Sequence, residues 1–568
     1  MSHSLKRWCI GVWVGAIVAL AALHALHLSA DFPNFSPWFM DWAKYTDEGW
    51  FGNGAVRMHV LGTWYVAGDF NPAAPLPVWP FLEWLVFAFS GVNIEAARGL
   101  AVACFFVNLA LVYRLIRFNG SQRGPQWAGL LAVTLLVSSP FLYCFTRLAI
   151  LEPMLMLLFL AALNIAVRVS GFRRPILGAA TVGLLFTLMM LTKTTAIFLL
   201  PAVAWALLLP YLRQFRRLIQ ASLAAGLTFA GLYGSWLALL THRGLMGDYK
   251  YLYSVNDYSK PPERWWPVVS SWWSFHGALW VDRILIPLAG FVILITLAAG
   301  GSSFLARRTP LYRTNLWARR LLLDPIFGAC FLGTAGYIVF MTLQNHPQPR
   351  YFAMVTYMMF ILLAKGAAAM LSGDGARGEL YLGEKAGRIT ARIPVGLSAR
   401  KLGVTIVSAS LAAIAFNTVW TVNYAMHPQY TFVTAARRLT EYIDNQPNGN
   451  RLLLSISGDE ISLITQIPAL CDDFVSPTAR IPDLPAKLAV YQPGWYASWN
   501  DIDPGTLIDL HTRYSIEQVA TFPAFDDPDR NLLVLFKLHP LPGGAVRAAG
   551  DPSMQAILPE DKFTVPVE

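Results

Sequence analysis

The sequence predicts a polytopic α-helical membrane protein with about eleven transmembrane helices and a small C-terminal extracytoplasmic α/β domain. Of its 568 residues, 55% are hydrophobic and only 14% are charged, a balance that argues against a set of soluble domains. Apolar stretches close to the roughly 20 residues needed to cross hydrocarbon recur from about residue 8 to residue 420. Beyond about residue 430 the composition becomes ordinary. The abundance of Leu, Phe and Trp excludes a strongly disordered chain, and five cysteines are too few for a disulfide scaffold.

The N-terminal segment sets the orientation of the first helix. Met1 to Arg7, followed by an apolar run, has the charge order of a secretory signal, and Leu28-Ser29-Ala30 faintly resembles a cleavage site. We favour a retained anchor, because the apolar run is longer than the core of a usual signal peptide. In both cases the N-terminus starts in the cytoplasm and Asp31 emerges outside.

The basic residues orient the helices that follow. The formal net charge is +10, yet Lys and Arg fall in short clusters between apolar segments, which favours membrane topology over nucleic-acid binding. Eleven spans place all these clusters in the cytoplasm. The clusters are Arg114/Arg117/Arg123, Arg168/Arg173/Arg174, Arg213/Arg216/Arg217, Arg307 to Arg320 and Arg377 to Lys401. The predicted spans are about 8–29, 97–117, 127–145, 148–168, 176–192, 194–211, 218–241, 284–304, 322–343, 351–371 and 401–422.

Three segments are predicted to face outward: the loop 31–96, the loop 242–283 and the chain after Asn423. Within the first loop, Val78 to Phe89 is too short for a confident span and is interpreted as a helix lying on the outer membrane surface. The second loop is rich in Trp and Tyr, which is typical of an interfacial aromatic belt, with sugar stacking as the alternative. Among its aromatic residues are Tyr249, Tyr251, Tyr253, Trp265, Trp266, Trp272 and Trp273.

The chain therefore divides into a membrane domain over 1–425 and an extracytoplasmic α/β domain over 426–568. Periodicity within the second domain predicts helices at Thr434 to Asp444 and from Gly458 to Thr465. It predicts strands at Arg451 to Ile456 and Asn531 to Leu538. The tail after residue 540, rich in Pro, Gly and charge, is expected to be loosely ordered.

Ionisable residues beside apolar spans are costly, by roughly 2.5 to 3.5 kcal/mol each on insertion scales, so their placement is informative. Under this topology seven of them converge at the outer surface: Asp47, Glu48, Arg147, Glu152, Lys193, His346 and Arg350. Each has a structural alternative. Arg147 and Glu152 pair with each other, Lys193 snorkels to the interface, or Arg350 anchors a helix end to headgroups. Taken as a set, the cations and carboxylates indicate a site for an anionic lipid-linked substrate.

An ordered series of motifs resembles the GT-C glycosyltransferases, most closely the branch holding protein O-mannosyltransferases and lipid A aminoarabinose transferases. The series begins in the first outward loop with Tyr45-Thr46-Asp47-Glu48-Gly49-Trp50, Gly68-Asp69-Phe70, Pro75-Leu76-Pro77, Ser90-Gly91-Val92 and Ala96-Ala97-Arg98. It continues with Arg147 to Pro153, Leu191 to Ala196 and Pro349-Arg350-Tyr351-Phe352. The likeness covers about residues 8 to 420 and does not specify one substrate.

The resemblance implies transfer of a sugar from a polyprenyl or dolichyl phosphate to an acceptor on the outer side, with inversion at the anomeric carbon. It makes Asp47 the candidate general base. Glu48, its neighbour, is expected to hold the acceptor, a nearby cation or a metal. Lys193 and Arg350 are the candidates that stabilise the departing lipid phosphate. Arg147 joins them or orients Glu152, and His346 is a weaker candidate donor.

No cofactor is required by this interpretation, although a divalent metal ion is an alternative because some GT-C relatives hold one. His59, His242, His276 and His346 all face outward but lack HExxH-like spacing. Asp501-Ile502-Asp503 and Asp527-Pro528-Asp529 imitate a DxD metal clamp but fall in turn-like segments.

The predicted function is therefore a polyprenyl-phosphate-dependent glycosyltransferase in the membrane, with a bacterial cytoplasmic membrane favoured. Its predicted partners are the lipid-linked sugar, a hydroxyl-bearing acceptor and the bilayer, without nucleic acid. The lipid tail is expected near Lys193, and the 78–89 helix with the 242–283 loop is expected to border the acceptor. A transporter or flippase of a lipid-linked sugar is the first rival, and a non-catalytic scaffold is the second. The sequence leaves the sugar, the acceptor (protein, lipid or glycan) and the length of the isoprenoid open.

Overall fold

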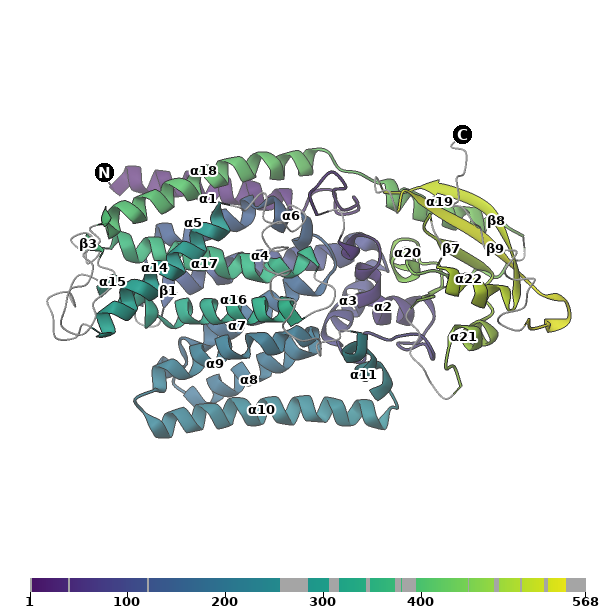
Figure 1. The fold of residues 1–568 in the computed structure, drawn as a ribbon, viewed down its shortest axis with the longest axis horizontal. Coiled ribbons are helices and arrows are strands. Elements are labelled where there is room, and N and C mark those ends of the chain that lie inside the picture. The colour runs from purple at the N-terminus through teal and green to yellow at the C-terminus, as the bar shows by residue number, and fades with distance from the viewer. Residues whose placement is uncertain are drawn as a thin grey trace.

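The protein consists of a helical bundle with a sheet-containing domain at one end (Figure 1). The structure is a computed structural model, and it describes residues 3–38, 41–119, 122–255, 284–305, 316–343, 348–372, 379–380, 395–447, 449–473, 480–500, 503–525 and 530–547. Most of the aromatic loop predicted at 242–283, including its five tryptophans, lies outside these residues. His276 and His346 also lie outside them.

The helical part is built from apolar helices that run along the bundle (Figure 1). They are α1 (His3–Leu23), α4 (Ile94–Arg117), α5 (Gln126–Ser138), α6 (Pro140–Thr146), α7 (Leu151–Ala166), α8 (Pro175–Thr192), α9 (Leu200–Leu208), α10 (Phe215–His242), α14 (Leu285–Leu305), α15 (Leu316–Leu322), α16 (Pro325–Leu343), α17 (Phe352–Leu371) and α18 (Ala399–Met426). Shorter elements connect them: α2 (Asp47–Val60), α3 (Val78–Ser90), α11 (Met246–Val255) and the 3-10 helices η1 (Trp42–Lys44), η3 (Thr194–Leu199) and η8 (Pro349–Tyr351).

Length and composition make this chain an integral multi-pass membrane protein. Among the described residues, eight helices are long and apolar enough to cross a membrane, or nine if the bent pair α5 and α6 counts as one span. Every one of the eleven predicted ranges overlaps a helix. However, α7 and the apolar part of α14 (Leu285–Gly301) are shorter than the other spans. The count of eleven therefore stays a prediction.

The predicted span 127–145 is not one straight helix, because α5 and α6 meet at an angle of 68°. Proline lacks the amide hydrogen that a continuing helix needs, and it pushes the preceding residue into extended backbone. Ser139 is accordingly extended, with φ −72° and ψ 116°, and its hydroxyl accepts a hydrogen bond from Leu142 N at 3.3 Å. Ser139 and Pro140 therefore end one helix and start the next.

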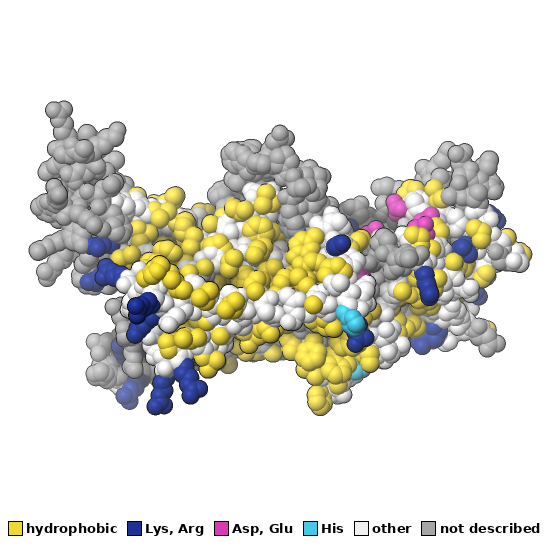
Figure 2. All heavy atoms as spheres, turned by 90° about the horizontal axis from the view of Figure 1, so that it is seen from below, with side chains coloured by type: hydrophobic (Ala, Val, Ile, Leu, Met, Phe, Trp, Pro, Cys, Tyr) yellow, Lys and Arg dark blue, Asp and Glu magenta, His cyan; other side chains and the backbone are white. Residues whose placement is uncertain are grey.

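Helix α17 forms the centre of the bundle, where it packs against α5, α14, α16 and α18 and is mostly buried. Helix α10 lies on the outside and buries only two of its residues, Ala221 and Leu240. Hydrophobic side chains cover the visible face of the bundle, and Lys and Arg gather at the end away from the sheet domain (Figure 2). This distribution suits a bundle whose surround is lipid and whose basic end is cytoplasmic.

The C-terminal part contains a mixed sheet whose strand order is β6-β5-β7-β9-β8. Strand β5 (Leu453–Leu454) pairs in parallel with β6 (Ala469–Leu470) and β7 (Trp495–Ser498), whereas β9 (Leu532–Pro540) pairs antiparallel with β7 and β8 (Tyr514–Pro523). Four helices accompany the sheet: α19 (Thr431–Asp444), α20 (Gly458–Thr465), α21 (Leu484–Tyr491) and α22 (Pro504–His511).

Polar contacts attach this sheet domain to the first outward loop. The Asp31 carboxylate accepts hydrogen bonds from Phe432 N at 2.8 Å and Val433 N at 3.1 Å, and so caps the start of α19. The Arg57 guanidinium of α2 is buried and donates to Asp69 at 2.5 Å and to Asp459 of α20 at 3.2 Å. Lys487 donates to the second oxygen of Asp69 at 2.8 Å. Buried charges that are paired in this way are costly to separate, so the two parts are held in a fixed arrangement.

Helix α2 also packs directly against α20 through Gly49. A Cβ atom at Gly49 would lie 2.2 Å from the Asp459 carbonyl carbon and 2.3 Å from Glu460 N. The Gly49 amide donates to the Glu460 carboxylate at 2.7 Å. Only glycine allows the two helix backbones to approach so closely.

We expect Gly49→Ala to push α2 away from α20 and to lower stability by about 1–3 kcal/mol, the usual cost of overpacking. Thermal unfolding in nanodiscs measures the loss. Gly231→Ala on α10 is the matched control, because nothing lies within 4 Å of the place that a Cβ atom would occupy there. Equal unfolding temperatures for the two variants would contradict the close contact.

Candidate active site

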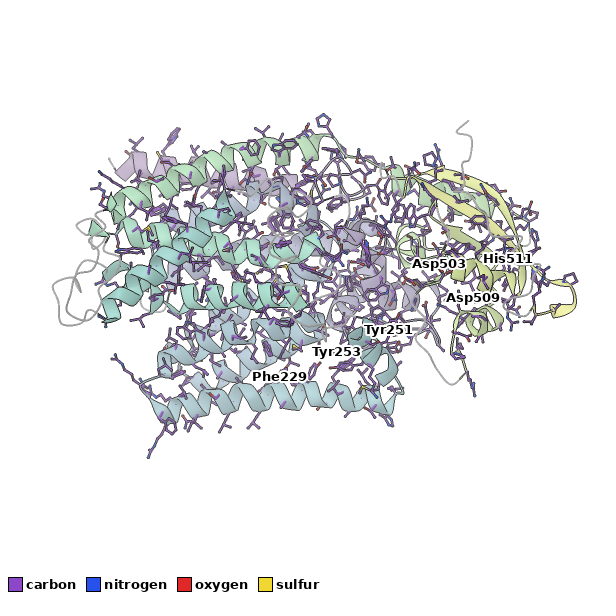
Figure 3. All side chains as sticks on the ribbon, in the orientation of Figure 1. Phe229, Tyr251, Tyr253, Asp503, Asp509 and His511 are labelled. Atoms are coloured by element: carbon purple, nitrogen blue, oxygen red, sulfur yellow. The ribbon has the colours of Figure 1, made fainter. Side chains whose placement is uncertain are left out.

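A cavity of about 330 Å³ lies where the helical bundle, the first outward loop and the sheet domain meet. Three of the predicted site residues, Asp47, Lys193 and Arg350, line this cavity. Its walls are otherwise largely aromatic and apolar: Trp42, Tyr45, Trp50, Phe51, Phe70, Leu76, Leu151, Tyr251, Leu252, Phe340 and Tyr351. Tyr251 marks the place in Figure 3, on α11 beside the junction of the two parts.

The three residues reach the cavity because each stands at the end of a helix. Asp47 is the first residue of α2, where a carboxylate suits the positive end of the helix dipole. Lys193 follows the last residue of α8 in extended backbone, with φ −156° and ψ 128°, so it interrupts the apolar run between α8 and η3. Arg350 lies in η8, which leads into α17. The bundle thereby presents these charged side chains at one end, where the apolar helices begin or stop.

Asp47, Lys193 and Arg350 belong to one connected cluster of charged groups, which Asp41 and Glu152 complete from behind the cavity wall. An Arg350 guanidinium nitrogen, Nη2, lies 2.5 Å from Asp47 Oδ2, while Nη1 donates to Asp41. Arg350 Nε lies 3.9 Å from Glu152 Oε1, the oxygen to which Lys193 Nζ donates. Glu152 therefore pairs with Lys193, and not with Arg147 as the structural alternative supposed. All five side chains are almost entirely buried.

Burial and neighbouring charges act on Asp47 in opposite directions. Burial raises the pKa of its carboxyl, and the Arg350 guanidinium lowers it. Asp41 and Glu152 raise the pKa of Asp47 further because they carry the same charge, whereas Lys193 lowers it. The net result is a pKa above the ordinary range for an aspartate. A raised pKa brings a carboxylate closer to the value that suits a general base near neutral pH.

Glu48 points away from the cavity, because successive helix residues are turned by about 100° from one another. It is fully buried and accepts hydrogen bonds from Arg98 Nε at 2.8 Å, Arg98 Nη2 at 2.6 Å and Ala149 N at 2.7 Å. Of the partners expected for Glu48, the structure thus supplies a cation, Arg98. These contacts fix the start of α2 against α4 and the loop before α7.

Arg147 also lies away from the cavity. Its guanidinium donates to the carbonyls of Leu26 at 2.5 Å and His27 at 2.6 Å, just after α1, and to the hydroxyl of Tyr143. Within the described chain, Arg147 forms no ion pair with Glu152 and does not line the cavity. Arg147 therefore stabilises the segment that directly follows the first helix, α1.

A second group of residues completes the site without having been predicted. Asp41 accepts from Arg350 N at 2.9 Å and from Ala43 N at 2.9 Å, in addition to the guanidinium. The sheet domain contributes Ile456, Asp473 and Arg530 to the cavity wall. In sequence, Asp41 is one more acidic residue in an outward loop, and Arg530 is one more basic residue in a soluble domain. Asp41 and Arg530 can be told apart from other charged residues only by the groups that they contact in the folded protein.

The described residues offer no evident metal centre. Among them, no three His, Cys, Asp or Glu side chains gather so as to hold a metal ion. His59 lies 3.4 Å from the Trp84 carbonyl and does not line the cavity. The divalent ion that some relatives hold stays a hypothesis for this chain, as does the donor role of His346, which lies outside the described residues.

Comparisons with known proteins bear on this arrangement. Residues 72–236 match the family model described as dolichyl-phosphate-mannose-protein mannosyltransferase. The fold is similar to that of ArnT from Cupriavidus metallidurans, solved bound to undecaprenyl phosphate, with 13% identity, a TM-score of 0.51, and 94% of this chain and 99% of that chain covered. The resemblance to the GT-C glycosyltransferases is confirmed.

Two further GT-C likenesses are weaker. The archaeal oligosaccharyltransferase AglB from Archaeoglobus fulgidus, in complex with an inhibitory peptide and a dolichol-phosphate, matches at 12% identity and a TM-score of 0.47 over 91% of this chain and 74% of that chain. The mycobacterial arabinofuranosyltransferase AftD matches at 15% identity and a TM-score of 0.42 over 95% and 40%. A comparison with curated proteins found no significant match.

The match to the family model includes Lys193 and Glu152 but begins after Asp47 and ends before Arg350. At 13% identity the likeness to ArnT shows the fold alone. The roles of the individual residues therefore rest on the geometry of this cavity.

Glu48 and Asp47 should respond differently to loss of their charge. We expect Glu48→Gln to lower stability by about 3–5 kcal/mol, because it leaves the buried Arg98 without its counter-ion. Asp47→Asn should cost much less, because Asp41 still pairs with Arg350. Thermal unfolding of both variants tests this. A Glu48→Gln protein as stable as the wild type would contradict the positioning role.

Proposed function

We propose that this chain is a glycosyltransferase that moves a sugar from a polyprenyl-phosphate donor to a hydroxyl acceptor at the extracytoplasmic face of the membrane. The supporting observation is the meeting of Asp47, Lys193 and Arg350 in one cavity at the end of an apolar helical bundle. The GT-C fold and the undecaprenyl phosphate bound to ArnT favour a lipid-phosphate donor.

The reaction needs a base and a stabilised leaving group. Asp47 removes the proton of the acceptor hydroxyl as its oxygen attacks the anomeric carbon. The bond from that carbon to the phosphate oxygen breaks, and Lys193 and Arg350 stabilise the charge that grows on the phosphate. A single displacement of this kind inverts the anomeric centre. Glu152 and Asp41 keep the two cations in position.

We propose that the lipid tail lies in a second, apolar groove, which contains a residue of the same 3-10 helix, η3, that lines the cavity. Lys193, Thr194 and Thr195 line the cavity, and the same 3-10 segment continues through Ile197 into a groove of about 240 Å³ between α8, α9 and α10. The groove is lined by apolar side chains such as Phe186 and Phe229. Its position beside α10, which is exposed to lipid, suits an isoprenoid chain that remains in the bilayer.

The cavity end of the bundle is proposed to be extracytoplasmic. The connection from α9 to the start of α10, which contains Arg213 to Arg217, lies at the opposite end of the bundle (Figure 1), the end at which Lys and Arg side chains gather (Figure 2). Lys and Arg are enriched on the cytoplasmic side of membrane proteins. The sheet domain would then lie outside a bacterial cytoplasmic membrane and face the acceptor.

The acceptor is proposed to enter between the first outward loop and the sheet domain. Arg530 stacks over the Tyr45 ring with its guanidinium carbon 4.3 Å from the ring centroid, and both line the cavity. Arginine and aromatic side chains together provide hydrogen-bond donors and a flat surface for a polar acceptor. The acceptor is a hydroxyl of a protein, a lipid or a glycan.

The first experiment is sugar release from a panel of polyprenyl-phosphate sugars by purified protein in nanodiscs. We expect Asp47→Asn to reduce release by about 10² to 10⁴, the usual contribution of a general base. Equal release by both proteins would remove Asp47 from the mechanism. Passage of the intact donor across the bilayer without release would favour the transporter instead.

A second variant tests the role of the sheet domain in acceptor binding. We expect Arg530→Ala to raise the KM for the acceptor by about tenfold, as loss of a charged hydrogen-bond donor does, and to leave the donor KM unchanged. Arg451→Ala is the matched control, because Arg451 pairs with Asp444 on the exposed surface. An unchanged acceptor KM would contradict this role.

A further inference from the structure

The donor phosphate has to enter a cluster that already contains more negative than positive groups. Asp41, Asp47 and Glu152 surround the two cations Arg350 and Lys193. When all five are ionised their formal charges sum to −1. A lipid phosphate adds at least one further negative charge to this buried region, where like charges repel strongly. This repulsion is relieved if one carboxylate of the cluster gives up its cation or its charge when the phosphate binds.

Asp41 is poorly suited to release the Arg350 guanidinium to the phosphate. Its side chain is fully buried, does not line the cavity and accepts from Ala43 N, Arg350 N and the Arg350 guanidinium. Two of these donors are backbone amides whose positions are fixed by η1 and η8. Moving Asp41 would leave two buried amides without acceptors.

Glu152 does not line the cavity either, so an entering phosphate would not contact it directly. It stands in the first turn of α7, and its Oε1 accepts from Lys193 Nζ. Its distance of 3.9 Å from Arg350 Nε makes it only a secondary partner of the guanidinium.

Asp47 differs from both, because it lines the cavity and is weakly anchored. Its Oδ1 accepts from the Thr46 hydroxyl at 3.2 Å, and its Oδ2 is paired with Arg350 Nη2 at 2.5 Å. A phosphate oxygen that enters the cavity would meet the same face of the guanidinium, Nη2, that Asp47 occupies. Nη1 would remain on Asp41.

We propose that the donor phosphate takes Arg350 Nη2 from Asp47, so that donor binding frees the carboxylate that acts as base, while Asp41 holds the guanidinium in place. This inference rests on the proposed function and deepens it. Asp41 is thereby a positioning residue, and Asp47 becomes available to the acceptor only when a donor is present.

The exchange also changes the proton affinity of the base. Arg350 lowers the pKa of Asp47, and burial raises it. When the phosphate takes Nη2, Arg350 lowers the pKa of Asp47 less strongly and a like charge arrives, so the pKa of Asp47 rises further. Lys193, which also faces Asp47, lowers its pKa, while Asp41 and Glu152 raise it. The carboxylate thus becomes a stronger base at the stage at which it is needed.

The test measures binding of undecaprenyl phosphate to the full-length protein in nanodiscs. We expect Asp47→Asn to bind about tenfold more tightly than the wild type, because the competing carboxylate is gone. Asp47→Ala should also bind undecaprenyl phosphate more tightly than the wild type. It serves as a second variant if Asp47→Asn folds poorly. Binding by both that is equal to or weaker than that of the wild type would overturn the exchange.

Asp41→Asn is the matched control, because it removes the same charge from the same guanidinium. We expect no tighter binding, a raised donor KM and an unchanged acceptor KM, with recovery of the donor KM in Asp41→Glu. Tightening by Asp41→Asn equal to that by Asp47→Asn would overturn the proposal in favour of a general charge effect. A wild type that does not bind undecaprenyl phosphate would instead overturn the proposed function, and the exchange with it.

Discussion

The buried guanidinium of Arg350 is the interaction on which the rest of the site depends. A charge in a dry interior is tolerated only when it is paired, and Arg350 finds its partners in Asp41 and Asp47, about 300 residues earlier in the chain. This pairing ties the first outward loop to the start of the central helix α17. It brings the candidate base to within ion-pair distance of a candidate phosphate ligand. The same contact therefore stabilises the fold and assembles the chemistry.

The sheet domain also helps to position the candidate base, Asp47. Tyr45, two residues before Asp47, packs in the same buried cluster as Phe432, Trp499 and Phe525 of the sheet domain. Gly49, two residues after Asp47, contacts the backbone of α20. The candidate base is thus held from both sides by a domain that follows the last membrane helix. Substitutions in that domain are therefore expected to affect catalysis in two ways: by moving the backbone of α2, and with it Asp47, and by altering contacts with the acceptor.

The likeness to known proteins and the geometry of the site carry different kinds of information. The likeness establishes the GT-C fold, and one family model covers the middle of the helical region. The family model does not reach Asp47 or Arg350, and a likeness at 13% identity does not assign roles to single residues. Their roles follow from physical reasoning about a carboxylate and cations that share a cavity at the end of an apolar bundle. The proposal for donor and acceptor therefore stands or falls with measurements on these residues.

The sequence by itself determined the local features of this protein. Runs of apolar residues located the membrane helices, and Lys193 marked the break between α8 and η3, because hydrocarbon demands continuous helices and a charge is costly within them. The resemblance further singled out Asp47, Lys193 and Arg350, which the structure brings into one cavity.

Contacts between distant segments were decided only by the tertiary structure. Adjacent in sequence, Asp47 and Glu48 look equivalent, but the turn of α2 sends one to the cavity and the other to Arg98. Arg147 looked like a partner of Glu152 and instead binds carbonyls after α1. Asp41 and Arg530 could not be singled out from the sequence, because the role of a charged side chain depends on the group that it contacts. Packing, and not sequence spacing, sets that partner.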